Sequence, residues 1–151
     1  MVESEVHNDL QEDTQSGRYL TFLIEDNEFA IEIRYTKEII GMQHITIVPG
    51  VPEYIRGIIN LRGKIVAVMD MRKRLKKTEV AYNERTSIII IEIENLEVGL
   101  IVDQVVDVIS IPEEDVIVSD AEYMKGIGRI DDKIKLIIDC KKLIGDLSST
   151  E

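Results

Sequence analysis

The sequence repeats itself with an offset of 69 residues, and this repeat limits the folds that the chain can adopt. Residues 53–58 (Glu-Tyr-Ile-Arg-Gly-Ile) align with residues 122–127 (Glu-Tyr-Met-Lys-Gly-Ile). The register continues without an insertion to Asp70, which aligns with Asp139. A chance match in an isoleucine-rich, acidic chain would not also align tyrosine, glycine and aspartate. Two copies of one supersecondary unit are therefore predicted.

The apolar residues favour strands over helices. Ile and Val predominate among them, Trp is absent, and aromatic residues make up only 5% of the chain. β-Branched side chains suit a pleated sheet, and the hydrophobic fraction of 44% is sufficient for a folded core. Two similar halves of short strands predict an all-β fold of two small β-barrels with a few short helices. Each half is too small to be stable alone, so the barrels should pack on each other and share a core.

The pattern also predicts how the chain is divided. Residues 1–17 are acidic and contain neither Lys nor Arg. They are predicted to be a disordered tail. The folded domain should span residues 18–147, with a first half of about 18–80 and a second of about 85–147. The sequence leaves open whether the two halves exchange strands.

Residues 57–71 contain the clearest local signal, a β-hairpin with a turn at residues 62–64. Gly63 can supply the positive φ that a tight reversal needs. Asn60 and Arg62 interrupt the apolar run just before the turn. Arg62 is either a solvated charge that discourages edge pairing or a residue that contacts a partner.

Comparison of the two copies separates structural residues from functional candidates. Gly57 aligns with Gly126 and Asp70 with Asp139, so the shared fold explains all four. Each aspartate is predicted to cap a short helix. Its replacement by alanine should lower the stability of the protein by roughly 1 kcal/mol. The hairpin tips differ between the copies: Asn60, Arg62 and Gly63 align with Arg129, Asp131 and Asp132. The reversed charge favours a contact role for Arg62.

Composition excludes several classes of function. The 18 basic and 29 acidic residues give a net charge of −11, which disfavours binding to nucleic acid and to anionic lipid. The first residues carry acids where a signal peptide would carry Lys or Arg, no apolar run is long enough to span a membrane, and Cys140 has no disulfide partner. A cytoplasmic protein without direct membrane insertion is therefore expected.

Catalytic chemistry is not visible in the sequence. His7 and His44 have no second ligand at metal-binding spacing, and no phosphate-binding loop is present. No enzyme activity, metal or cofactor is therefore predicted. A basic cluster at residues 72–77 is either a solvated helix face or a docking patch for an acidic surface.

The motif Asn60-Leu61-Arg62-Gly63, together with residues 34–40 (Arg-Tyr-Thr-Lys-Glu-Ile-Ile), resembles the CheW family of chemotaxis adaptors. The resemblance extends from about Tyr19 to Leu147. It implies two five-stranded β-barrels and a non-catalytic protein. Such a protein couples the cytoplasmic tips of chemoreceptors to the regulatory domain of a CheA-like histidine kinase, in receptor arrays at the inner membrane. A CheV-like scaffold, an excised kinase regulatory domain and a small-ligand-binding β-barrel protein are the alternatives.

The resemblance also implies a partner-binding site. Arg62 and Glu38 are expected to form an ion pair at the hairpin tip, and Gly57 to support the strand that presents Arg62. The expected partner-binding residues are Ile33, Glu38, Ile39, Asn60, Arg62 and Gly63.

Overall fold

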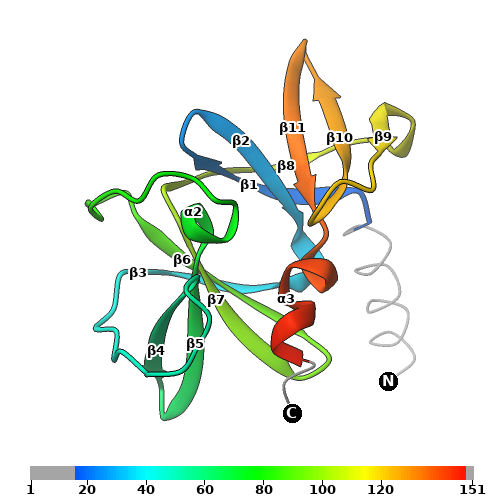
Figure 1. The fold of residues 1–151 in the computed structure, drawn as a ribbon. Coiled ribbons are helices and arrows are strands. Elements are labelled where there is room, and N and C mark those ends of the chain that lie inside the picture. Colours follow the sequence, from blue (N-terminus) through cyan, green and yellow to red (C-terminus); the bar gives the residue numbers. More distant parts are fainter. Residues whose placement is uncertain (1–15, 149–151) are drawn as a thin grey trace.

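The computed structural model describes residues 16–148 and is built from two β-sheets and a few short helices (Figure 1). The predicted tail of residues 1–17 lies outside the described residues except for its last two. The first five strands are β1 (Arg18–Ile24), β2 (Asn27–Glu32), β3 (Thr36–Gly41), β4 (Ile55–Leu61) and β5 (Lys64–Asp70). The others are β6 (Ser87–Ile93), β7 (Leu96–Val102), β8 (Gln104–Ser110), β9 (Val116–Val118), β10 (Met124–Ile130) and β11 (Lys133–Ile138). The helices are η1 (Ile33–Tyr35), α2 (Met71–Arg74), η2 (Glu113–Asp115) and α3 (Cys140–Ser148).

The predicted all-β class is confirmed, but the expectation of two closed five-stranded barrels is wrong. One sheet has six strands in the order β8-β1-β2-β11-β10-β9, and the other has five in the order β3-β6-β7-β5-β4. The sixth strand, β9, pairs with β10, whereas the matching segment of the other sheet makes only the isolated bridge between Thr46 and Ile58. Ile58 faces Thr46, whereas its repeat equivalent Ile127 faces Ile117, so the offset of 69 residues does not hold across this segment.

The two sequence halves exchange strands, a point that the repeat alone left open. β1 and β2 join β8–β11 in the six-stranded sheet, while β6 and β7 join β3–β5 in the five-stranded sheet. The exchange is symmetric: β5 runs parallel to β7 with Val68 opposite Gly99, and β11 runs parallel to β2 with Ile137 opposite Ala30. The halves of about 18–80 and 85–147 therefore each contribute strands to both sheets.

The shared core expected between the halves is present. The largest buried cluster draws Leu20 and Phe22 from β1, Leu100 from β7, and Leu143 and Ile144 from α3, so it lies between the two sheets. A second cluster fills the other face of the five-stranded sheet, with Ile59, Val66, Val68, Ile88 and Ile90 among its residues. The matching cluster of the six-stranded sheet is small and consists of Tyr19, Ala30, Ile111 and Ile137.

Both predicted helix caps form hydrogen bonds. The Asp70 carboxylate accepts from the backbone N–H groups of Arg72, at 2.9 Å, and Lys73 at the start of α2. The Asp139 carboxylate accepts from the backbone N–H of Lys142, at 3.1 Å, at the start of α3. Asp70 is also buried and accepts a 2.8 Å hydrogen bond from the Tyr82 hydroxyl, so its role is larger than that of Asp139.

We expect Asp70→Ala to cost more stability than Asp139→Ala. Loss of a cap alone costs about 1 kcal/mol, which is the expected loss at Asp139. At Asp70 the Tyr82 hydroxyl also loses its acceptor in a half-buried place, so the total should reach about 2–3 kcal/mol. Urea denaturation of the two variants measures the difference. Equal losses would show that the Tyr82 hydrogen bond contributes nothing.

Candidate partner-binding site

The β4–β5 hairpin presents Arg62 on a two-residue turn. Leu61 and Lys64 form the last strand pair, so Lys64 belongs to β5 rather than to the predicted turn. Arg62 and Gly63 have φ values of +52° and +85°, the pattern of a tight hairpin turn with two left-handed residues. The side-chain oxygen of Asn60 accepts a 2.8 Å hydrogen bond from the Gly63 N–H. Asn60 and Gly63 therefore set the shape of the turn, and Arg62 is its outward-pointing residue.

Arg62 forms an ion pair with Glu38 of β3, as expected. β3 and β4 are the two edges of the five-stranded sheet, so this pair joins strands that share no backbone hydrogen bonds in the ladder. The Arg62 side chain remains 67% exposed. An ion pair this exposed contributes little to stability because solvent screens it. Its main consequence is to orient a cation toward solvent.

A second set of charges, which sequence reasoning missed, lies beside this pair. Glu97 of β7 accepts hydrogen bonds from Lys64 and Lys37, and its side chain is only 7% exposed. We call Lys37, Glu38, Arg62, Lys64 and Glu97 the tip cluster. The repeat offered one signal: Glu97 aligns with Glu28, which also pairs with a lysine, Lys135, at 2.7 Å.

The hydrogen bonds to Glu97 should make the stability of the protein depend on pH. The bond from Lys64, followed by that from Lys37, lowers the pKa of Glu97 below its ordinary range. A lowered carboxyl pKa in the folded state contributes stability above the ordinary pKa, and this contribution is lost as pH falls through the folded-state pKa. Wild type should therefore melt at a higher temperature than Glu97→Gln at pH 7, and the gap should close below about pH 4. A gap that is constant from pH 7 to pH 3 would contradict this role.

The structure does not bring all the predicted partner-binding residues together. Ile39 is adjacent to Glu38 on β3 and is 44% exposed, which suits a contact. Ile65, which the sequence analysis did not select, follows Lys64 on β5 and is 66% exposed. Ile33 lies in η1, is half-buried, and packs against the main core. Its position supports a packing role.

Gly57 lies in β4 upstream of the hairpin tip. Its φ is +152°, and a Cβ atom there would lie 2.2 Å from the carbonyl oxygen of Thr46. A side chain cannot fit at this position because the backbone of Thr46, which pairs with Ile58, lies directly against it. Gly57 does not belong to the tip cluster and acts through the backbone of β4.

Internal carboxylates pair with most of the basic cluster of residues 72–77. Arg72 donates to both carboxylate oxygens of Asp103, and Lys77 lies 3.5 Å from Glu25. Lys73 lies 3.7 Å from Glu79, and Arg74 is buried. The structure therefore supports a structural role for this cluster rather than a docking patch.

Three further features concern metal binding, membrane-spanning helices and the single cysteine. Among residues 16–148, no group of three or more His, Cys, Asp or Glu residues could hold a metal ion. In the same range no helix combines the length and apolar content that crossing a membrane requires. Burial raises the pKa of the Cys140 thiol far above its usual range, so the thiol stays protonated in the core. The chain is thus a two-sheet β protein with an exposed charged cluster at one hairpin tip.

Comparison with known proteins specifies the family. The model of the CheW-like domain matches residues 18–148. The chemotaxis protein CheW of Klebsiella aerogenes is 30% identical over 139 residues, which cover 87% of this chain and 84% of that protein. CheW of Bacillus subtilis is 42% identical over 99 residues, covering 66% of this chain and 64% of that protein. The crystal structure of the scaffolding protein TtCheW from Thermoanaerobacter tengcongensis superposes with a TM-score of 0.78 at 35% identity, covering 82% of this chain and 88% of the other.

The chain therefore belongs to the CheW-like family, and it is a chemotaxis adaptor. This confirms the resemblance found at residues 60–63.

Proposed function

We propose that this protein is a non-catalytic adaptor that binds both the regulatory domain of a CheA-like histidine kinase and the cytoplasmic tip of a chemoreceptor. It would act in the cytoplasm, in receptor arrays held at the inner membrane through these partners. The observation that supports this proposal is the tip cluster: an exposed arginine is presented by a tight turn and paired with Glu38, the chain neighbour of the exposed Ile39. Family membership supplies the classes of partner.

The tip cluster has the properties of a recognition surface. It contains three cations and two carboxylates, so it is locally positive on a chain of net charge −11. Glu38, Ile39 and Arg62 would contact the partner, while Asn60 and Gly63 hold the turn that positions Arg62. Ile33 would contribute through the packing of η1, which precedes β3. Arginine at the centre of such a surface is a common hot-spot residue.

Arg62→Glu tests the proposal. The charge reversal should weaken binding to the kinase regulatory domain or to a receptor hairpin fragment by at least tenfold, equivalent to about 1.4 kcal/mol. The stability of the variant should stay close to that of wild type, because solvent screens the exposed Arg62–Glu38 pair. Titration calorimetry with each purified partner measures the affinity, and thermal unfolding measures the stability.

Arg129→Glu is the matched control. Arg129 lies on β10 near the tip of the repeat-related hairpin, is 73% exposed, and undergoes the same change of charge. Arg129→Glu should leave the affinities for both partners within about twofold of those of wild type. If Arg62→Glu binds both partners as well as wild type, Arg62 does not belong to the binding site. If wild type binds neither partner, the proposed function is wrong.

A further inference from the structure

The chain between α2 and β6 joins the two copies of the repeat and crosses one end of the five-stranded sheet. Residues 78–85 of this connection, which we call the strap, contain no helix or strand. The strap lies beside Asp70, the last residue of β5, whereas Lys64 of the tip cluster is the first residue of that strand. The strap and the tip cluster therefore lie at opposite ends of the sheet.

The backbone does not hold the strap to the sheet. In the part of the chain that the structure describes, no residue from 78 to 85 forms a backbone–backbone hydrogen bond with a strand. The N–H groups of Asn83 and Arg85 donate only within the local turn, to the side-chain oxygens of Thr86 and Asn83. Every strap residue except Tyr82 is exposed. These are the features of a segment that opens locally.

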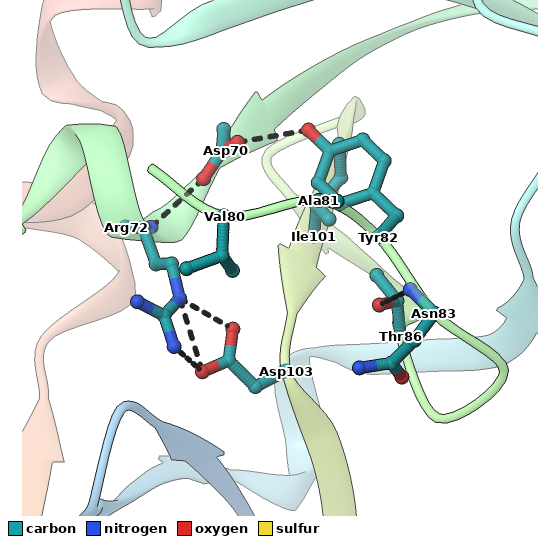
Figure 2. Close-up of a pocket in the computed structure, with 9 residues that line it drawn as sticks. All are labelled: Asp70, Arg72, Val80, Ala81, Tyr82, Asn83, Thr86, Ile101 and Asp103. Atoms are coloured by element: carbon teal, nitrogen blue, oxygen red, sulfur yellow. Dashed lines mark hydrogen bonds and ion pairs between the residues drawn. The ribbon is translucent and has the colours of Figure 1, made fainter. Parts of the chain in front are cut away.

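Tyr82 is the strap residue that reaches the core. Its ring packs against the buried cluster that contains Ile59 and Val66, and its hydroxyl donates a 2.8 Å hydrogen bond to the Asp70 carboxylate (Figure 2). The Arg56 guanidinium lies 5.4 Å from the ring centroid, within the range of cation–π attraction. One side chain thus combines apolar packing, a hydrogen bond and a contact with a cation.

The other contacts of the strap are polar. Arg72 donates at 2.9 Å to the Thr78 carbonyl oxygen, and Glu79 pairs with Arg56 at 2.6 Å. Solvent screens this ion pair, since the Glu79 side chain is 46% exposed. A cavity of about 90 Å³ also remains between the strap and Ile101 of β7. The strap is therefore not close-packed on the sheet, and its attachment depends on its tyrosine.

We propose that the strap opens and closes as one unit while both sheets stay folded, and that Tyr82 holds it closed. Opening withdraws the Tyr82 ring from the end of the core and uncovers Ile101 and the Asp70 carboxylate. An apolar site with one hydrogen-bond acceptor suits a phenol, so the closed protein carries its own tyrosine as the ligand of this site. The proposal does not depend on the adaptor function, because no strap residue belongs to the tip cluster.

Cleavage by trypsin measures the opening. Trypsin cuts after Lys77 and Arg85, at the two ends of the strap, and it must draw an extended segment into its active site. The initial rate of cleavage therefore follows the population of the open form. Tyr82→Ala should raise this rate about tenfold or more. Tyr82→Phe keeps the ring but loses the hydrogen bond, so its rate should lie between those of wild type and Tyr82→Ala.

The urea dependence of cleavage in wild type separates local opening from global unfolding. Lys135 is buried in β11, so cleavage after it requires the six-stranded sheet to unfold. Local opening exposes little surface, and global unfolding exposes much more. Low concentrations of urea should therefore leave the rate at Arg85 nearly constant and raise the rate at Lys135 steeply. This measurement needs no variant.

Tyr35→Ala is the matched control. Tyr35 is also half-buried and has an arginine over its ring, with the Arg34 guanidinium 4.8 Å from the ring centroid. It packs against the main core rather than under the strap. Its replacement should leave the rate of strap cleavage within about twofold of wild type.

Free p-cresol, which has the structure of the tyrosine side chain, tests the site under the strap. In Tyr82→Ala, the amide NMR signals of Asp70 and Ile101 should shift on addition of p-cresol, and the melting temperature should rise with its concentration. Toluene lacks the hydroxyl group and should bind about tenfold more weakly. In wild type, Tyr82 occupies the site and p-cresol should not shift these signals.

Three results would each overturn the proposal. The first is a rate of strap cleavage in Tyr82→Ala that equals the rate in wild type. The second is the same urea dependence of cleavage at Arg85 and at Lys135, which would mean that the strap opens only when the whole fold does. The third is the absence of p-cresol shifts at Asp70 and Ile101 in folded Tyr82→Ala.

Discussion

Replacing Arg74 by alanine is expected to lower the free energy of unfolding by about 3–5 kcal/mol. Arg74 of α2 is only 5% exposed. Its guanidinium lies 4.0 Å from the ring centroid of Tyr54 and 4.4 Å from that of Tyr123, and it donates a 2.7 Å hydrogen bond to the Leu143 carbonyl oxygen. The variant loses two cation–π contacts, a buried hydrogen bond and the packing of the long side chain.

The size of this effect follows from where the contacts lie. Tyr54 directly precedes β4 and Tyr123 directly precedes β10, so one guanidinium joins equivalent positions of the two repeats. The hydrogen bond to Leu143 also ties α2 to α3. Tyr123 has a φ of +65°, a strained conformation for a bulky residue. Contact with Arg74 helps to offset this strain. No residue in the other copy reproduces the role, because Leu143 is the repeat equivalent of Arg74.

Two further variants distinguish the contribution of the Arg74 charge to stability from that of its packing. Arg74→Met retains most of the volume without the charge and should lose about 2 kcal/mol. Lys76→Ala changes an exposed neighbour and should stay within about 0.5 kcal/mol of wild type. Urea denaturation of the three variants measures the series. If Arg74→Ala is as stable as Lys76→Ala, the guanidinium does not hold the two repeats together.

The repeat predicted the fold class and the equivalence of elements, but it did not predict strand pairing. β4 and β10 span 55–61 and 124–130, so the offset of 69 residues relates them without error. The offset aligns a strand with its copy, however, and does not say which strand lies beside it. The parallel pairing of β5 with β7 crosses from one copy to the other, and the same local pattern would suit either arrangement. Pairing of this kind depends on tertiary contacts that local sequence does not encode.

The sequence likewise predicted only the part of the site that local motifs mark. The Arg62–Glu38 pair was expected from the family resemblance, since two short motifs mark its residues. Glu97 was not, because its lysine partners lie 60 and 33 residues away and on other strands. The basic run at 72–77 looked like a surface patch, yet acids from distant segments pair with it.

Gly57→Ala is expected to cost about 2–4 kcal/mol of stability. The new Cβ would lie 2.2 Å from the Thr46 carbonyl oxygen and 2.9 Å from its carbon, and the φ of +152° is one that L-residues rarely adopt. The Thr46 backbone cannot move away without losing its two 2.9 Å hydrogen bonds with Ile58. Because these bonds hold β4 just upstream of Asn60, the change should also disturb the turn that presents Arg62.

Two other glycines calibrate this prediction. At Gly126, the repeat equivalent, a Cβ would lie 2.7 Å from the Ile117 carbonyl oxygen with no left-handed φ, so Gly126→Ala should cost less, about 1–2 kcal/mol. At Gly41 a Cβ meets nothing within 4 Å, and Gly41→Ala should be within about 0.5 kcal/mol of wild type. Thermal unfolding gives the order of stability, and kinase binding at a temperature where all three variants are folded isolates the effect on the turn. If folded Gly57→Ala binds the kinase as tightly as Gly41→Ala does, the hairpin tip does not depend on the Thr46–Ile58 bridge. The turn would then keep its shape through the Asn60–Gly63 hydrogen bond alone.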